Sequence, residues 1–146
     1  MLAIATAALV ASGMVPGFLP STGWHVRVSR ASAPSAIAAT IPIRDPSGQF
    51  PPHRTLAALP STGVVVHVTN YGARPVTAQR RLPLSLSGVR LQHRFEGVPA
   101  KYAFQRIRAR VSGSSIDVIV FYGNPRPTAA EQARANAEVR RLTLRR

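Results

Sequence analysis

Residues 112–144 read SGSSIDVIVFYGNPRPTAAEQARANAEVRRLTL, a hydrophobic segment followed directly by a polar, alanine-rich one. Residues 116–122 are rich in β-branched and aromatic side chains, which favour a strand. Successive side chains of a strand point to opposite faces, and here both faces are apolar except at Asp117. Such a strand is typical of the interior of a sheet that is covered on each side. We therefore expect residues 116–122 to form a central strand.

The residues that follow predict the end of this strand and the start of a helix. Gly-Asn-Pro at residues 123–125 interrupts the sheet, because proline has no N–H to donate to a neighbouring strand. Thr128 and Glu131 have the spacing of a capping box, in which the threonine hydroxyl accepts a hydrogen bond from the N–H three residues later. Apolar residues then recur at helical spacing over residues 135–142. We expect a C-terminal helix that packs on the sheet.

A hairpin is predicted immediately before the central strand. Residues 102–111 alternate apolar side chains with arginines, and residues 112–115 have the composition of a four-residue hairpin connection. In that register the apolar faces of the two strands coincide, and Arg110 lies opposite Asp117. We therefore expect an antiparallel hairpin that contains an Arg110–Asp117 ion pair.

Strand-like patterns also occur in four earlier segments, residues 23–30, 37–43, 63–70 and 89–95. The first is expected to bury one face, and the second is placed at a sheet edge because Pro42 removes a donor. Residues 54–59 predict one helical turn, and residues 76–87 predict irregular structure. The sequence therefore predicts an α+β fold, a mostly antiparallel sheet of five to six strands with a C-terminal helix packed on it.

Residues 1–20 form an apolar leader in which no side chain is charged. Small residues at 10–13 fit the cleavage site of a secretory signal peptide, and an uncleaved membrane anchor is the alternative. We assign residues 1–20 to a signal peptide or membrane anchor and residues 21–146 to a single small α+β domain. The expected location is extracytoplasmic, either secreted or anchored in a membrane through this segment.

One property of the leader opposes export. A signal peptide normally carries Lys or Arg before its apolar run, but the first charged side chain here is Arg27. Basic residues after the segment would favour retention of the domain in the cytoplasm under the positive-inside rule. Our hypothesis is that the true start lies upstream and that the basic region precedes Met1. Upstream in-frame codons without Lys or Arg would contradict it.

The charge of the chain raises the question of an anionic partner. Its 19 basic residues against 5 acidic ones give a formal net charge of +14, which favours contact with polyanions. Lys101 is the only lysine, so all other basic residues are arginines. Codon bias in a GC-rich genome would produce this skew without selection for binding. The charge alone therefore leaves open whether the chain binds a polyanion.

A ladder of arginines is the candidate binding site. Its members are Arg106, Arg108 and Arg110 on one predicted strand, joined by Arg90 and Arg94 on the preceding one. Alternate residues of a strand lie roughly 6.6 Å apart, close to the spacing of charges on a phosphate polymer. The same pattern is also that of an ordinary solvent-facing sheet surface. Aromatic stacking platforms are lacking along the ladder, so a nucleic acid is disfavoured as the partner.

No catalytic, metal or cofactor site is predicted. The four histidines have no ligand spacing, the chain contains no cysteine, and neither a G-x-S-x-G elbow nor a glycine-rich phosphate loop is present. Asp45 is assigned to a turn, and His93 to an apolar face. We expect a non-catalytic accessory or interaction domain that binds an unknown envelope protein. The alternative is a binder of anionic polymer or anionic membrane surface through the arginines.

Overall fold

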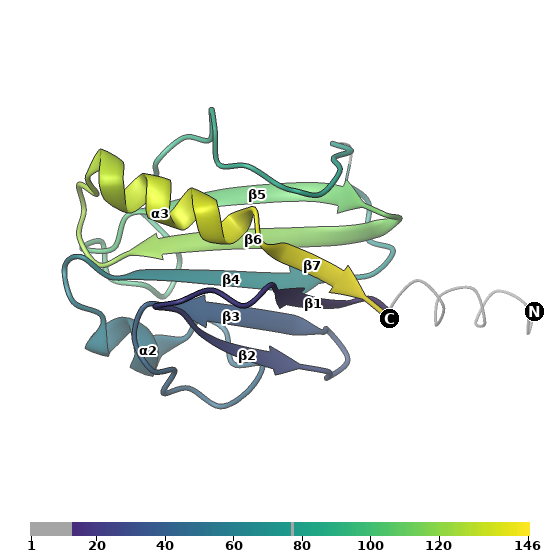
Figure 1. Cartoon of the computed structure of the whole chain (residues 1–146), viewed down its shortest axis with the longest axis horizontal. Helices are drawn as coiled ribbons and strands as arrows, with labels where there is room; N and C mark the ends of the chain where they lie inside the picture. The colour runs from purple at the N-terminus through teal and green to yellow at the C-terminus, as the bar shows by residue number, and fades with distance from the viewer. Residues whose placement is uncertain (1–12, 77) are drawn as a thin grey trace, which may run out of the picture.

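The computed structural model describes residues 13–76 and 78–146. Within these residues, strands form two antiparallel sheets, and helices pack against the larger one (Figure 1). In chain order the elements are β1 (Val15–Phe18), β2 (His25–Ser29), β3 (Ser35–Ala39), α2 (His53–Ala58), β4 (Val64–Asn70), β5 (Phe104–Val111), β6 (Ser114–Tyr122), α3 (Ala129–Val139) and β7 (Leu142–Arg145). The predicted class, a mostly antiparallel sheet with a C-terminal helix, is confirmed.

The larger sheet has the strand order β2-β3-β4-β6-β5, and all neighbouring strands are antiparallel. β6 lies between β4 and β5, and every one of its residues is buried. The predicted central strand is therefore confirmed. Its two apolar faces contribute to two separate cores, because alternate side chains of β6 point to opposite sides of the sheet.

The first core lies between the sheet and α3. Ile116, Val118 and Val120 of β6 meet Ala135 and Val139 of the helix in this layer. The second core lies on the opposite face, where α2 packs. It contains Leu56 and Leu59 together with an aromatic cluster, whose members are Phe50, Phe95, Phe104 and Phe121. Both faces of the sheet are thus covered.

The start of α3 follows the predicted capping box. Thr128 is the N-cap, and its Oγ1 accepts a hydrogen bond from the Glu131 N–H at 3.1 Å. The end of the helix differs from the prediction, because α3 stops at Val139 and residues 142–145 form β7. Leu142 still belongs to the first core, but it reaches that core from a strand.

β1 and β7 pair with each other as a second, two-stranded antiparallel sheet. Val15 lies opposite Arg145, and Phe18 lies opposite Leu142. β1 contacts β2, β3 and β4, so the pair covers part of the sheet face that also carries α3 (Figure 1). Residues 15–18, which the sequence assigned to the leader, therefore form a strand that pairs with the C-terminal end of the domain.

The predicted leader lies mainly in residues 1–12, outside the described residues. Among residues 13–76 and 78–146, no helix is both long enough and apolar enough to cross a membrane. Asn70 Nδ2 donates a hydrogen bond to the Met14 carbonyl oxygen at 2.8 Å. The domain therefore makes ordered contacts from Met14 onward.

Three predictions about strands need correction. β3 is an interior strand and β2 is the edge, because the chain leaves β3 before Pro42 could interrupt its pairing. β2 does not bury one face, since Val26 and Val28 are both exposed. Residues 89–95 form isolated bridges only, the main one joining Gln92 to Phe104 at the start of β5. The alternating apolar and polar residues of this segment therefore belong to a loop that runs beside the edge of the sheet.

The β5–β6 hairpin has a shorter turn than predicted. Ser112 and Gly113 both have positive φ angles, 50° and 81°, as a two-residue type I′ turn requires. Ser114 therefore already pairs with Val111. The register moves by two residues, which keeps every side chain on its predicted face but places Arg108, and not Arg110, opposite Asp117.

Candidate anion-binding cleft

Three of the predicted site residues lie on one face of β5. Arg106, Arg108 and Arg110 point to the same side as Phe104, the side of the second core, while the alternate residues of β5 are buried under α3. β5 is the last strand of the sheet, so these side chains lie near its edge. The predicted arginine ladder exists as a row, but its members have different surroundings.

Arg106 is held by Asp117. Its Nε donates to Asp117 Oδ1 at 2.9 Å and its Nη2 donates to Oδ2 at 2.5 Å, a bidentate ion pair. Donation of these hydrogen bonds to the Asp117 carboxylate raises the pKa of Arg106. The guanidinium also lies 5.7 Å from the centre of the Phe95 ring. The positive charge of Arg106 is therefore largely balanced by Asp117, and its role is structural.

The side chain of Arg108 is more exposed than that of Arg106 and lies farther from Asp117. It lies opposite Asp117, but its Nε is 3.9 Å from Oδ2 and 62% of the side chain is exposed. Among the described residues, both ion pairs involve this one carboxylate. Asp117 can balance only one positive charge, and Arg106 has the closer geometry. The charge of Arg108 is thus available to a ligand.

A cleft of about 530 Å³ opens beside Arg108. Its walls come from the middle of β5, from the start of β6 and from the segment after β4, which supplies Tyr71 and Arg74. That segment is fixed to the sheet by backbone hydrogen bonds from Tyr71 to Ser115 and from Ser115 to Gly72, at 2.9 and 2.7 Å. The Arg74 guanidinium lies over the Tyr71 ring, 4.7 Å from its centre. The cleft is thus lined by arginines from two distant parts of the chain.

The remaining predicted arginines do not join this cleft. Arg110 lies opposite Ser115, and its backbone pairs with residues 78 and 80. Arg94 is exposed and lines a separate hollow with Arg106 and Glu96. Arg90 is exposed in the loop that passes β5. The expected surface of five arginines is therefore divided, and Arg108 is the member that faces the cleft with a free charge.

Most acidic side chains are buried, which leaves a strongly basic surface. Asp45, Asp117 and Glu138 are 4%, 8% and 1% exposed, respectively. The turn predicted to begin at Asp45 begins one residue later, because the Gln49 N–H donates to the Pro46 carbonyl oxygen at 3.1 Å. The Asp45 carboxylate accepts hydrogen bonds from the N–H groups of Arg54 and Thr55 at the start of α2. Few carboxylates thus remain at the surface to compete with an anionic ligand.

His67 is a core residue of the sheet. It is 3% exposed, and burial lowers its pKa to about 4 against an opposing attraction from Asp117. Its Nδ1 lies 3.5 Å from Thr69 Oγ1, and its ring lies 4.7 Å from that of Phe50. His93, which was expected on an apolar face, is exposed. Within the described residues, no group of three His, Cys, Asp or Glu side chains could hold a metal ion.

Comparisons with family models, with curated proteins and with solved structures found no match to this chain.

Proposed function

We propose that this chain is an exported or membrane-tethered, non-catalytic binding domain whose ligand is an anionic polymer. The choice of an anionic ligand rests on one observation: Arg74 and Arg108 line the same cleft. The one carboxylate that lines this cleft, that of Asp117, is already paired with Arg106. Guanidinium groups bind phosphate, sulfate and carboxylate through paired hydrogen bonds, which favours these groups as the units of the polymer.

Binding by this cleft is expected to depend strongly on salt. Each charge contact with a polyanion releases counterions, so affinity falls as the salt concentration rises. Wild-type protein should therefore be retained on heparin at low salt and released at moderate salt. Replacing Arg74 and Arg108 together by glutamine should lower the slope of log affinity against log salt by about two, one for each lost contact.

The matched control replaces Arg54 and Arg126 by glutamine. Both residues are exposed, neither lines the cleft, and the net charge changes by the same amount. This control should elute close to wild type. Equal losses in both double variants would show that net charge alone causes retention and would contradict the cleft. Retention on anionic vesicles but not on heparin would contradict a polymer and favour a membrane surface.

Export can be tested by fractionating cells and determining the first residue of the protein in each fraction. Met14 and β1 take part in the fold, so processing has to occur before Met14 if the mature domain is to keep these contacts. We expect a mature chain that begins at residues 11–14 in the extracytoplasmic fraction, or an intact chain in the membrane fraction if the segment is an anchor. A soluble cytosolic chain with Met1 in place would contradict the proposal.

A further inference from the structure

β2 forms one edge of the larger sheet, and its outer side is open at Val26. The opposite edge, β5, has loop residues paired along it, including Gln92 with Phe104 and Gln79 with Arg110. On β2, Ser47 Oγ donates to the Val28 carbonyl oxygen at 3.3 Å, so that carbonyl points away from β3. The N–H and C=O groups of Val26 also point away from β3, because the backbone groups of alternate residues in a strand point to the same side. Among the described residues, no backbone group outside β3 pairs with Val26.

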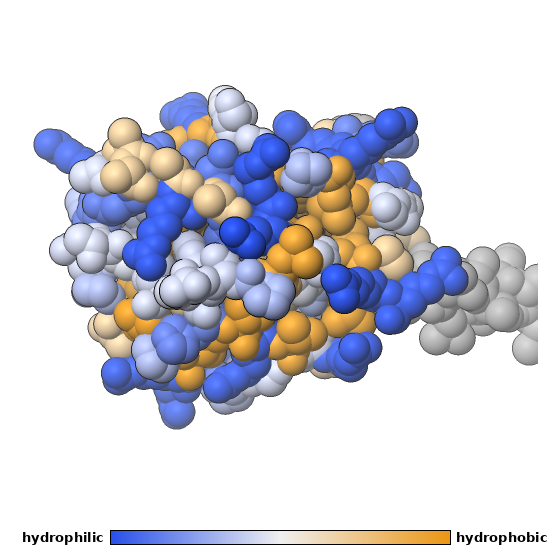
Figure 2. Space-filling model, viewed as in Figure 1, coloured by the Kyte–Doolittle hydropathy of each residue, from blue (hydrophilic) through white to orange (hydrophobic). Residues whose placement is uncertain are grey.

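The face of β2 next to α3 and β1 is apolar and uncovered. Val26 and Val28 lie opposite Ala38 and Ala36, which belong to the first core, yet each valine is 42% exposed. Leu19, just after β1, is 44% exposed. Figure 2 shows apolar side chains reaching the surface on this side of the molecule, between hydrophilic ones. Exposed apolar groups along a free strand edge are typical of a docking surface.

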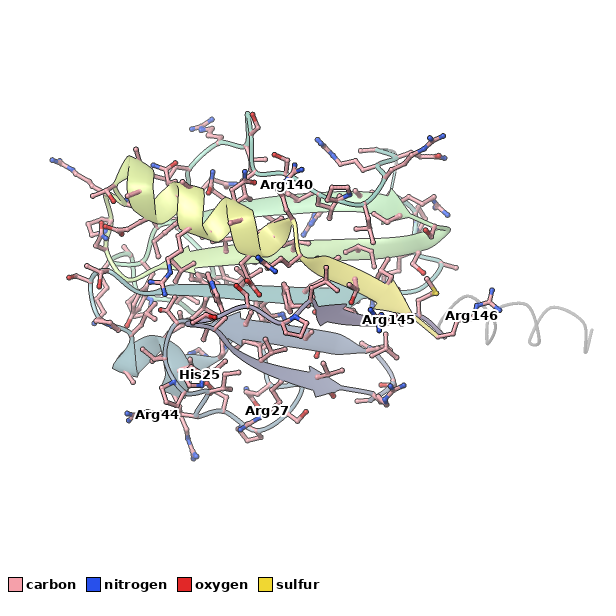
Figure 3. The ribbon with its side chains drawn as sticks, in the orientation of Figure 1. His25, Arg27, Arg44, Arg140, Arg145 and Arg146 are labelled. Carbon is pink, nitrogen blue, oxygen red and sulfur yellow. The ribbon has the colours of Figure 1, made fainter. Side chains whose placement is uncertain are left out.

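The other face of β2 is basic. His25 and Arg27 alternate with the valines and point to the opposite side of the sheet. Figure 3 shows both at the same border of the molecule as Arg44. The Arg27 guanidinium donates to the carbonyl oxygens of Asp45 and Ile43, and among the described residues no carboxylate forms an ion pair with it. The edge therefore offers backbone hydrogen bonds, an apolar face and a positively charged face.

We infer that β2 is a docking edge for an extended segment of a partner protein, in which apolar residues alternate with acidic ones. The segment would pair with the Val26 backbone, place its apolar side chains beside Val26 and Val28, and place its carboxylates near Arg27. A second copy of this chain fits poorly, because antiparallel pairing of two β2 strands about their centres sets Arg27 beside its own copy. The net charge of +14 per chain adds to this repulsion.

The test uses the full chain and two fluorescein-labelled peptides, TVEVEVT and TVKVKVT. We expect the acidic peptide to bind saturably in fluorescence anisotropy, at least about tenfold more tightly than the basic one. Val26→Pro removes an outward N–H that β3 does not use, so the variant should fold and lose binding by about tenfold. Val26→Ala keeps that N–H and should retain most of the affinity.

A second measurement follows amide exchange by NMR. The acidic peptide should slow exchange of the Val26 N–H and leave that of Arg27, which faces β3, unchanged. Equal binding of the two peptides, absence of saturable binding, undiminished binding by folded Val26→Pro, or dimerisation through β2 would overturn the inference. If Val26→Pro does not fold, the amide exchange of the Val26 N–H in the wild-type protein, with and without the acidic peptide, tests the inference. The Arg74→Gln/Arg108→Gln variant should bind the peptide normally, which separates this edge from the cleft.

Discussion

Replacing Glu138 by methionine is expected to stabilise the domain at neutral pH by about 1–3 kcal/mol, the usual cost of burying an unpaired polar group. Glu138 is 1% exposed on the inner side of α3, and neither carboxylate oxygen has a hydrogen-bond partner among the described residues. Methionine fills a similar volume without a charge, and its flexible side chain adapts to an irregular space. Urea unfolding of both proteins at pH 7 measures the gain.

The gain should shrink as the pH falls. Burial raises the pKa of Glu138 above its usual value, while attraction from Arg141 opposes the rise. The folded state therefore holds its proton more tightly than the unfolded chain, and wild-type stability decreases as the pH rises through the range between the two pKa values. Below that range the carboxyl is neutral in both states, and only the cost of an unpaired neutral group remains.

Glu96→Met is the matched control, because Glu96 is exposed in a loop. It should change the free energy of unfolding by no more than about 0.5 kcal/mol at any pH, as surface substitutions usually do. A loss of stability in Glu138→Met at neutral pH would show that the carboxylate has a favourable partner and that its burial is not a cost.

The elements that could be predicted are those specified by their own residues. Residues 116–122 are apolar on both faces except at Asp117, and an interior strand of a covered sheet is the position that buries both faces. Thr128 and Glu131 mark the start of α3 because a capping box is a local interaction between neighbours. In each case the signal and the structure that it specifies lie within a few residues, so no knowledge of the rest of the chain is needed.

The elements that could not be predicted depend on distant partners. β1 and β7 are four-residue strands with weak patterns, and each forms because the other end of the chain lies beside it. The order of β2 and β3 in the sheet is likewise a property of the whole topology. The hairpin register depended on whether Ser112 could adopt a positive φ, which is uncommon for a residue other than glycine.

In the candidate site, too, the locally specified features could be predicted and those that depend on distant residues could not. The row of arginines on β5 follows from strand alternation and could be predicted from residues 106–110 alone. Arg74 could not, because residues 71–75 indicate a turn without indicating that the turn lies against Ser115. The partner of Asp117 was assigned wrongly for two reasons. A two-residue error in register put Arg110 in the place of Arg108 opposite Asp117, and the close ion pair forms with Arg106, the next arginine of β5 on the same face.

Replacing Asp117 by asparagine is expected to weaken the fold and strengthen anion binding at the same time. The change removes the charge that holds Arg106 in a bidentate pair, within a site where Asp117 is 8% exposed. We expect a loss of about 2–3 kcal/mol in the free energy of unfolding, because the guanidinium keeps a weaker, neutral acceptor in place of a carboxylate. Urea unfolding at pH 7 measures this loss.

The released charge should act on the ligand. Arg106 lines the same cleft as Arg108, so its guanidinium becomes available to an anion once Asp117 is neutral. The slope of log heparin affinity against log salt should steepen by about one. Asp45→Asn is the control, because it removes another buried carboxylate, one that bonds to the start of α2 and does not line the cleft. If both variants gain the same affinity, net charge explains the gain; if Asp117→Asn binds heparin more weakly, the carboxylate itself organises the cleft for its ligand.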